Sequence, residues 1–282
     1  MKIGLIAGGG DLPRHVMRGA LAQSHEVFII ALEGFFQTED FIQAGAAGIA
    51  RFSYGEFGKV VKRLKQENCT HICLAGQVSR PNFMRLKPDF QTLKRLPAAL
   101  KAAQNGDDGL LSYIVSIFEE EGFGIIPPQD LCRALLMPSG HLGSVRIEAS
   151  MREDAQKACY IARQMGAHDI GQGAIICRGL VLAVEAQEGT DEMLRRVGRL
   201  PENIRGTPKA RAGILAKMVK PDQESRVDLP TIGPKTAELA SAAGLAGIVV
   251  ESDGAFVIDK ERVIEIANKE GLFIAGLPPQ TR

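Results

Sequence analysis

The first part of the chain alternates short apolar runs with stretches of helical spacing, and this alternation limits the fold more than any other feature. Apolar runs at residues 2–7, 26–32 and 71–75 each end in a turn that contains Gly. Strands and helices that alternate at this pitch are typical of a parallel sheet with helices on its faces. We therefore predict an α/β fold with a Rossmann-like N-terminal domain over residues 1–130. The helical patterns lie at residues 14–23, 55–67, 91–103 and 109–121.

The second part of the chain mixes hairpin-like strands with helices. Proline-rich breaks separate it from the first part, so we predict a linker over residues 131–140 and a second domain over residues 141–282. Arg178-Gly179 joins two apolar runs and is typical of a hairpin turn. A helical pattern begins near Thr190, which we predict to be its N-cap. The mixture predicts a second α/β domain with a mixed sheet.

The charge balance and the aromatic content argue against a nucleic-acid partner. The 282 residues include 34 Lys or Arg and 33 Asp or Glu, for a net charge of +1, and there is no Trp. An even balance gives no general attraction to a phosphate backbone, and few rings are available for base stacking. The five Cys form no Cys-x-x-Cys motif, which indicates buried free thiols in a reducing cytoplasm. No apolar run reaches the about 18 residues of a membrane span, so we expect a cytoplasmic protein that is at most peripheral to a membrane.

One stretch of the second half departs from this even balance. Residues 195–220 contain eight basic side chains against the single acid Glu202. Two interpretations stay open: acids elsewhere in the fold balance these charges, or the charges form a surface for phosphate groups or an anionic bilayer. The basic residues are Arg195, Arg196, Arg199, Arg205, Lys209, Arg211, Lys217 and Lys220.

A glycine-rich turn from Gly8 to Pro13 follows the first strand. Glycines let backbone N–H groups approach a phosphate closely, and the N-terminus of the next helix adds a favourable dipole. The turn is not a dinucleotide fingerprint, because Pro13 stands where the last Gly belongs, and no Walker A sequence follows. It fits phosphate contact or a purely structural turn better than NAD binding. We take Gly9, Gly10 and Asp11 as candidate substrate-binding residues.

The loop after the third strand leaves the sheet at the edge where open α/β sheets bind ligands. Gly76, Ser79 and Arg80 are candidates there for contact with a sugar hydroxyl and a phosphate, and the alternative is an ordinary surface loop. Asp107 and Asp108 lie at a helix entry, where an N-cap pair and a cation site both stay open.

Three carboxylates crowd the end of a strand in the second half, at Glu185, Glu188 and Asp191. Carboxylates this close repel one another unless a cation intervenes, and either Mg²⁺ or the neighbouring arginines would serve. We predict Glu185 and Gln187 on one side of the strand, with Glu188 in the turn. Glu185 and Glu188 are candidate metal ligands, and Gln187 and Thr190 are candidate substrate contacts.

The densest polar segment is residues 220–234, where Lys, Arg and three acids alternate between prolines that fix the backbone. It follows a strand and precedes a helix. Nucleophile and metal-site patterns are missing, since no Gly-x-Ser-x-Gly occurs and the five His are scattered. The segment therefore indicates carboxylate-plus-cation chemistry, that is, metal-assisted attack of water on phosphorus. The alternative is a capped, salt-bridged turn.

Seven sequence blocks lie in order along nearly the whole chain: IAGGGDLP (residues 6–13), GEFGK (55–59), AGQVSRP (75–81), GDD (106–108), DIGQG (169–173), GLVLAVEAQEGTD (179–191) and KPDQESRVDLPTIG (220–233). No single block is specific, but their combination is. Together they resemble the LpxI-type UDP-2,3-diacylglucosamine diphosphatases of lipid A biosynthesis.

This resemblance implies an enzyme that cuts the diphosphate of UDP-2,3-diacylglucosamine into UMP and 2,3-diacylglucosamine 1-phosphate (lipid X). It implies dependence on Mg²⁺ and a cytoplasmic location, peripheral to the inner membrane. It also implies two domains that hold the lipid between them, and we expect the C-terminal domain to be the catalytic one. Whether the chain forms a homo-oligomer stays open.

The resemblance also implies roles for residues of the last polar segment. Asp228 corresponds to a key catalytic residue of the family. Lys220 and Arg226 would stabilise the charge that develops on the diphosphate, and we take Lys220 as a second catalytic residue and Arg226 as a substrate contact. Glu224 stands where some members have Asp, and with Asp228 it is a candidate metal ligand. The remaining candidate substrate contacts are Gln172, Gln223 and Thr231.

Two other functions stay open. A Rossmann-type oxidoreductase would bind NAD(P)H, and the broken glycine fingerprint argues against it. A non-catalytic UDP-sugar or lipid-binding protein would keep its affinity for the ligand but show no turnover with Mg²⁺.

Overall fold

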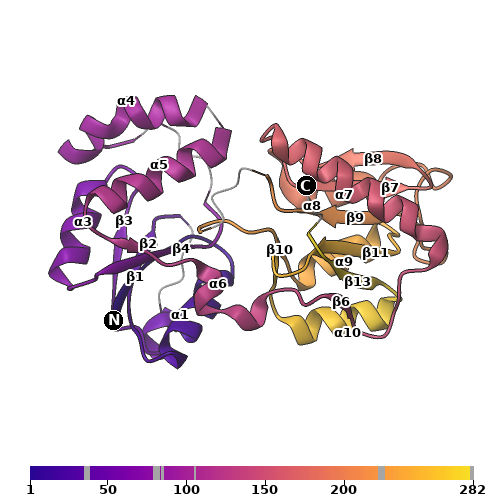
Figure 1. The fold of residues 1–282 in the computed structure, drawn as a ribbon, viewed down its shortest axis with the longest axis horizontal. Coiled ribbons are helices and arrows are strands. Elements are labelled where there is room, and N and C mark those ends of the chain that lie inside the picture. The colour runs from indigo at the N-terminus through magenta and orange to yellow at the C-terminus, as the bar shows by residue number, and fades with distance from the viewer. Residues whose placement is uncertain (35–38, 79–82, 84–85, 105, 222–225, 280–282) are drawn as a thin grey trace. The chain divides into compact units, whose positions relative to one another are not determined.

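The computed structural model describes residues 1–279 apart from 35–38, 79–82, 84–85, 105 and 222–225. Its contacts divide the chain into two compact units (Figure 1), which meet in sequence between residues 134 and 135. Residues 226–228 are an exception, because they belong to the first unit although they follow much of the second in sequence.

The first unit is built on a parallel sheet, as the alternating pattern predicts. Its strands are β1 (Lys2–Ala7), β2 (Glu26–Leu32), β3 (Gly48–Phe52), β4 (His71–Ala75) and β5 (Gly124–Ile125). They lie in the order β3-β2-β1-β4-β5, and every pair of neighbours is parallel. β1 and β2 are buried along nearly their whole length, which matches their continuous apolar sequences.

Helices cover this sheet with side chains at helical spacing. α3 (Phe57–Gln66) buries Val60, Val61 and Leu64, the face that the sequence predicts. Its close approach depends on Gly4 in β1, since a Cβ there would stand 2.3 Å from Leu64 Cδ2. The other helices are α1 (Leu12–Ala22), α2 (Glu39–Gln43), α4 (Phe90–Gln104), α5 (Gly106–Glu120) and α6 (Pro128–Leu131), followed by the 3₁₀ turn η2 (Arg133–Leu135).

The second unit is built on a mixed sheet, again as predicted. Its strands are β6 (Gly140–Leu142), β7 (Gly173–Cys177), β8 (Leu180–Val184), β9 (Ile214–Lys217), β11 (Gly247–Glu251) and β13 (Phe273–Leu277), in the order β6-β13-β11-β9-β7-β8. β9, β11 and β13 are parallel, whereas β6, β7 and β8 run antiparallel to their neighbours. Arg178-Gly179 joins β7 to β8, which confirms the predicted hairpin. A separate parallel pair consists of β10 (Thr231–Ile232) and β12 (Phe256–Val257).

Helices cover both faces of the mixed sheet. Successive residues of β9 alternate between two apolar cores, with Ile214 and Ala216 in one and Leu215 in the other. The 3₁₀ turn η3 (Ala149–Met151) and α7 (Arg152–Ala167) complete the first core. The second core is completed by α8 (Gly189–Gly198), α9 (Pro234–Ala242) and α10 (Lys260–Glu270).

The structure corrects one local prediction and adds short elements. The predicted N-cap Thr190 is wrong, because α8 begins at Gly189 and Glu188 holds the N-cap position. The Thr190 hydroxyl is instead bonded to Glu185. β3, β5 and β6 do not stand out in the sequence, since none of them is a long apolar run.

All five cysteines are buried and free, as expected. Burial raises the pKa of Cys132 to about 12 and the pKa of Cys69 and of Cys159 to about 11, so these thiols stay protonated at neutral pH. Over the part of the chain that the structure describes, no helix is long and apolar enough to cross a bilayer.

Candidate functional site

The candidate site of the second unit lies where its parallel strands end. β9 ends in Lys217 and β11 ends in Glu251. Glu185 follows the end of β8 and lies at the same end of the sheet, because the start of β7 pairs both with the end of β8 and with Lys217. Open α/β sheets bind ligands outside the carboxyl ends of their strands. We call the polar side chains at this end, which also include Asp169 and Lys220, the carboxyl edge.

Three ion pairs hold the carboxylates of the carboxyl edge. Every side chain in them is at most 22% exposed, so water screens these charges little and each carboxylate depends on its cation. The pairs are Lys220–Asp169 at 2.5 Å, Arg163–Glu251 at 3.0 Å and Lys217–Glu185 at 4.0 Å.

A hydroxyl bridges the pair of Lys217 and Glu185. Thr190 Oγ1 donates to Glu185 Oε1 (2.5 Å) and accepts from Lys217 Nζ (2.8 Å). We call these three residues the carboxyl-edge network. Lys217 Nζ also donates to the carbonyl of Thr231 (3.4 Å), three residues after Asp228. Glu185 and Lys217 are 7% and 6% exposed, and Glu185 Oε2 is buried with no hydrogen-bond partner among the described residues.

Two glycines make room for Glu185. A Cβ on Gly173 would stand 2.6 Å from Glu185 Oε2, and one on Gly171 would stand 2.2 Å from the Glu185 carbonyl oxygen. Between them lies Gln172, whose Oε1 is also buried without a hydrogen-bond partner in the described part of the chain. The glycines of the block DIGQG therefore leave room for the start of the block EAQEGT.

A second ion pair joins two of the sequence blocks. Lys220 Nζ lies 2.5 Å from Asp169 Oδ1, which ties the start of KPDQESRVDLPTIG to DIGQG across 51 residues of sequence. Gly166 leaves room for the lysine, because a Cβ there would stand 3.1 Å from Lys220 Cγ. The ammonium predicted to stabilise a phosphate is therefore a nearly buried cation in a fixed position.

Glu188 and Gln187 differ from Glu185 in their surroundings. β8 ends at Val184, so strand alternation does not reach Gln187, which is exposed in a turn, whereas Glu185 is buried. The expectation that Glu185 and Gln187 face one side of a strand is therefore wrong. Glu188 is paired with Arg196 at 2.7 Å.

A divalent metal at the carboxyl edge stays a prediction. Glu185 Oε2 offers a hard oxygen of the kind that Mg²⁺ prefers, and Mg²⁺ is commonly held by one or two carboxylates together with phosphate oxygens. Glu185 therefore fits as a ligand. Within the ranges that the structure describes, no three His, Cys, Asp or Glu side chains gather in a group that could hold a metal. Glu224 lies outside those ranges.

Asp228 and Arg226 lie in the segment that belongs to the first unit. Arg226 is 2.7 Å from Glu119 near the end of α5, in a pair exposed enough to add little stability. Asp228 is partly buried in the loop that leads to β10. Thr231, the first residue of β10, donates its hydroxyl to the carbonyl two residues earlier (3.2 Å).

In the first unit, the glycine-rich turn is tied to the loop after β4. Gly9 N donates to Gln77 O (2.7 Å) and Gln77 N donates to Gly9 O (2.9 Å). Gly76, with a φ of +96°, lies so close that a Cβ on it would stand 2.7 Å from Gly9 O. The N–H of Gly9 is thus committed within the protein, whereas Gly10 borders open space and Asp11 is exposed. Three candidate substrate contacts lie outside the described residues: Ser79, Arg80 and Gln223.

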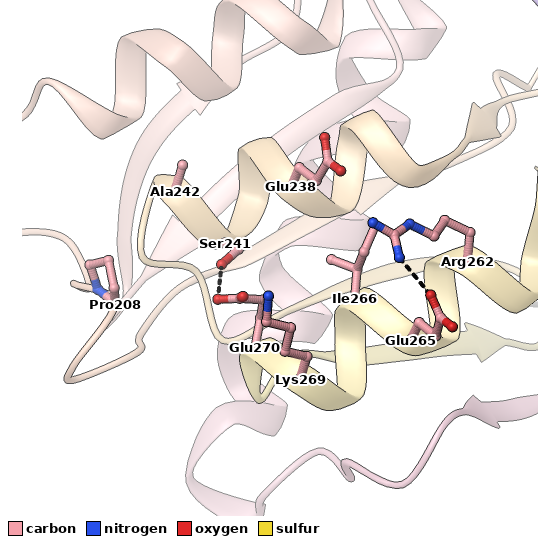
Figure 2. Close-up of a pocket in the computed structure, with 9 residues that line it drawn as sticks. All are labelled: Pro208, Glu238, Ser241, Ala242, Arg262, Glu265, Ile266, Lys269 and Glu270. Carbon is pink, nitrogen blue, oxygen red and sulfur yellow. Dashed lines mark hydrogen bonds and ion pairs between the residues drawn. The ribbon is translucent and has the colours of Figure 1, made fainter.

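A cavity of about 530 Å³ lies elsewhere in the second unit, beside α9 and α10 (Figure 2). Its lining includes Ser241 and Glu270, which are hydrogen bonded at 3.0 Å, and Arg211 donates to both of them. We call these three residues the amino-edge network, because Arg211 precedes β9 in the chain. Glu238, Glu265, Arg262 and Lys269 also line the cavity, which lies beside the last turns of both helices. Arg262 is paired with Glu265 at 2.6 Å, and helix C-termini disfavour anions, so this cavity suits a diphosphate less well than the carboxyl edge.

The basic segment 195–220 is largely neutralised within the fold. Most of its cations pair with carboxylates, which favours the first of the two interpretations, a balance across the fold. The pairs are Arg195–Glu192, Arg196–Glu188, Arg205–Glu202, Arg211–Glu270, Lys217–Glu185 and Lys220–Asp169.

Sequence reasoning misses several residues of the carboxyl edge. For Lys217 there is one usable signal, a charged residue inside the apolar run 212–219. Arg163 and Glu251 carry no such signal, because 88 residues separate the two members of their pair.

Comparison with known proteins identifies the family. The model of the LpxI N-terminal domain matches residues 2–135, and that of the LpxI C-terminal domain matches residues 138–275. The UDP-2,3-diacylglucosamine pyrophosphatase LpxI of Caulobacter vibrioides is 48% identical over 282 residues, which cover 100% of this chain and 99% of the relative. A solved structure, the N5-carboxyaminoimidazole synthetase from Staphylococcus aureus, matches 65% of this chain and 41% of its own, with 16% identity and a TM-score of 0.24. The family models and the full-length relative confirm the resemblance carried by the sequence blocks, and the chain belongs to the LpxI family.

Proposed function

We propose that this chain is a hydrolase that cuts the diphosphate of UDP-2,3-diacylglucosamine into UMP and 2,3-diacylglucosamine 1-phosphate (lipid X), as a step of lipid A biosynthesis. The observation that carries the proposal is the 48% identity, over the whole chain, to a curated pyrophosphatase of that name. The carboxyl edge supports it, because nearly buried cations and carboxylates gather there at the ligand-binding end of a sheet.

The reaction sets three requirements for the site. A water oxygen forms a bond to one phosphorus while the bond from that phosphorus to the bridging oxygen breaks. The water loses a proton, which a nearby carboxylate can accept. Negative charge grows on the leaving phosphate and on the attacked phosphoryl group, and fixed cations stabilise it.

We assign these tasks to residues of the last polar segment. Asp228 accepts the proton of the attacking water or orients that water. Lys220, which Asp169 holds in place at 2.5 Å, stabilises the charge on the diphosphate. Arg226 and Thr231 are further candidate contacts of the substrate. A cation that is already positioned needs little reorganisation during the reaction, which supports the role of Lys220.

We propose Mg²⁺ as the cofactor, with Glu185 as one protein ligand and Glu188, Glu224 and Asp228 as further candidates. The buried Oε2 of Glu185, which has no hydrogen-bond partner among the described residues, supports this assignment. Bound Mg²⁺ would supply Lewis-acid stabilisation of phosphoryl oxygens. We further propose that the protein acts at the cytoplasmic surface of the inner membrane as a peripheral protein, because its proposed substrate carries two acyl chains.

Release of UMP from UDP-2,3-diacylglucosamine tests the proposal. We expect turnover with Mg²⁺, loss of turnover in EDTA, and a reduction of about 10²–10⁴-fold in kcat for Asp228→Asn with substrate binding retained. Glu238→Gln is the matched carboxyl-to-amide control, because Glu238 is exposed on α9 and lines the cavity beside α9 and α10, not the carboxyl edge. A native chain that binds the substrate but releases no UMP with Mg²⁺ would establish the non-catalytic binding protein instead.

A further inference from the structure

The outward side of α4 in the first unit is apolar. Phe90, Leu93 and Leu100 are 71%, 55% and 41% exposed, and Pro97 is exposed as well. These four residues fall at helix positions i, i+3, i+7 and i+10, so they line one side of α4 over about 15 Å. We call them the α4 stripe.

The inward side of α4 carries small or polar residues and one large apolar residue, Leu96, which is partly buried. Ala103 is 5% exposed, and Thr92 and Ala99 are partly buried on the same side of the helix. An ordinary surface helix buries its larger apolar side chains and exposes its polar ones. α4 instead exposes three of its four large apolar side chains, all of them in the α4 stripe, and contiguous apolar surface of this kind marks an interaction site.

α4 is firmly attached to the first unit, so the exposure of the stripe does not reflect a loose helix. Asp89 precedes the helix and accepts from the N–H groups of Thr92 (2.8 Å) and Lys59 (3.0 Å). On the inner side, the Arg95 guanidinium lies 2.6 and 3.2 Å from the two acids at the end of α5. In Figure 1, α4 lies along α5.

The block GEFGK, which has no place in the proposed reaction, shapes the start of α4. A Cβ on Gly55 would stand 2.6 Å from Lys87 O, and one on Gly58 would stand 2.7 Å from Gln91 Cγ. Asp89 N donates to Gly55 O at 2.8 Å. The two glycines of this block therefore allow the segment that enters α4 to lie close to α3.

Two lysines flank the stripe. Lys94 and Lys101 are exposed along one side of it, and neither has an ion-pair partner within the described part of the chain. The Lys94 ammonium lies 4.5 Å from the centroid of the Phe90 ring. The cations of segment 195–220, in contrast, are mostly paired. An apolar stripe bordered by unpaired lysines is the composition of helices that lie in the interface of anionic bilayers.

We propose that the α4 stripe is the surface by which this protein docks on an anionic lipid bilayer. Phe90, Leu93 and Leu100 enter the boundary of the acyl chains, and Lys94 and Lys101 contact lipid phosphates. The proposal deepens the proposed function and rests on it in one respect, since a diacylated substrate resides in such a bilayer.

Sedimentation with vesicles tests the docking surface without any turnover. The vesicles contain phosphatidylethanolamine with phosphatidylglycerol, and pure phosphatidylcholine vesicles serve as the neutral comparison. We expect Phe90→Ser with Leu93→Ser to weaken binding to the anionic vesicles at least about tenfold, because two apolar anchors are lost. The double variant Lys94→Glu with Lys101→Glu reverses two charges, and we expect it to lower the affinity for anionic vesicles at least about tenfold. High salt reduces this difference from the native protein, because salt screens the charges.

The matched control removes two exposed apolar side chains elsewhere. Leu180 and Val181 on β8 are 51% and 47% exposed, so Leu180→Ser with Val181→Ser keeps vesicle binding within about twofold of the native protein. Native-like binding by the α4 variants would overturn the proposal. The proposal would also be overturned if the native protein were an oligomer that the α4 variants convert into a smaller species, because a second copy of the chain would then cover the stripe.

Activity on detergent-dispersed substrate separates this proposal from the proposed function. We expect the α4 variants to release UMP in micelles within about twofold of the native rate, because the changed side chains are exposed and none of them is a proposed site residue. A native chain that hydrolyses the substrate in micelles but does not bind anionic vesicles overturns the docking surface alone. A chain that binds vesicles through α4 but never releases UMP overturns the enzymatic function alone.

Discussion

The two flanks of β9 carry networks of the same chemical make-up in different surroundings. In each network, a hydroxyl donates to a carboxylate and accepts from a cation. The carboxyl-edge network consists of Lys217, Thr190 and Glu185, and the amino-edge network consists of Arg211, Ser241 and Glu270.

The networks differ in how fully their polar groups are satisfied. Arg211 also donates to the carbonyls of Ser241 (3.1 Å) and Leu245 (3.3 Å), and the Glu270 side chain is 35% exposed to water. The Glu185 side chain is only 9% exposed, and its Oε2 has no hydrogen-bond partner among the described residues. The amino-edge network thus satisfies its groups within the fold, whereas the carboxyl-edge network keeps an acceptor available at the ligand-binding end of the sheet.

Removal of the two carboxylates separates the networks most strongly. Glu185→Leu leaves the Lys217 charge buried without its carboxylate, and we expect it to lower the free energy of unfolding by about 3–5 kcal/mol. Glu270→Leu leaves a cation that still has two carbonyl acceptors, so about 1 kcal/mol is expected. Urea unfolding of both variants measures the difference, and equal losses would contradict it.

Removal of the two cations separates function from stability. Lys217 holds the Thr231 carbonyl beyond Asp228, so Lys217→Met shifts that segment and lowers kcat for UMP release about 100-fold, with KM changed far less. Arg211→Met lowers the melting temperature but leaves kcat within about twofold. If Lys217→Met kept the native kcat while losing stability, the two cations would have the same structural role.

A methyl group at Gly173 probes the space around Glu185 more gently. In Gly173→Ala the new Cβ would stand 2.6 Å from Glu185 Oε2, and such overpacking costs about 1–3 kcal/mol. Gly198→Ala, at the end of α8, meets only Ala243 at 3.6 Å and gains up to about 1 kcal/mol from helix propensity. Thermal unfolding distinguishes the two variants, and a neutral Gly173→Ala would show that Glu185 can move.

Thiol labelling provides the comparison with the smallest expected effect. Cys159 lies near the Arg163–Glu251 pair, and Cys177 ends β7 at the opposite end of the sheet. Burial raises the pKa of both thiols, so neither gives thiolate at neutral pH. We expect iodoacetamide to modify neither in the folded protein and both in urea, as read by mass spectrometry. Labelling of one in the folded state would show that its end of the sheet opens.

The sequence predicts those parts of the fold that depend on local pattern. Continuous apolar runs identify β1 and β2, and Arg178-Gly179 identifies the hairpin. A helical period also identifies α4, but it cannot say which side faces inward, because that depends on contacts of Asp89 and Arg95 with other elements. The two-residue strand β5 is defined by its pairing with β4 and not by its own residues.

The candidate site is predictable to a similar extent. Glu185 and Thr190 are found as a polar cluster at a strand end, although strand alternation wrongly groups Gln187 with Glu185. The contribution of Lys217 is missed, because its hydroxyl partner lies 27 residues away and its carbonyl partner 14 residues away. Such pairings arise only when folding brings the end of β9 next to the start of α8 and the start of β10.

Residues 226–228 belong to the first unit, although the chain on either side belongs to the second. During translation, every strand of the first unit has therefore been synthesised once the chain reaches residue 125. The last segment of that unit is complete only when residue 228 has been added. The proposed catalytic carboxylate of Asp228 is thus the last part of the first unit to be synthesised. A gene split after residue 134 would encode Asp228 on the fragment opposite to the unit in which it resides.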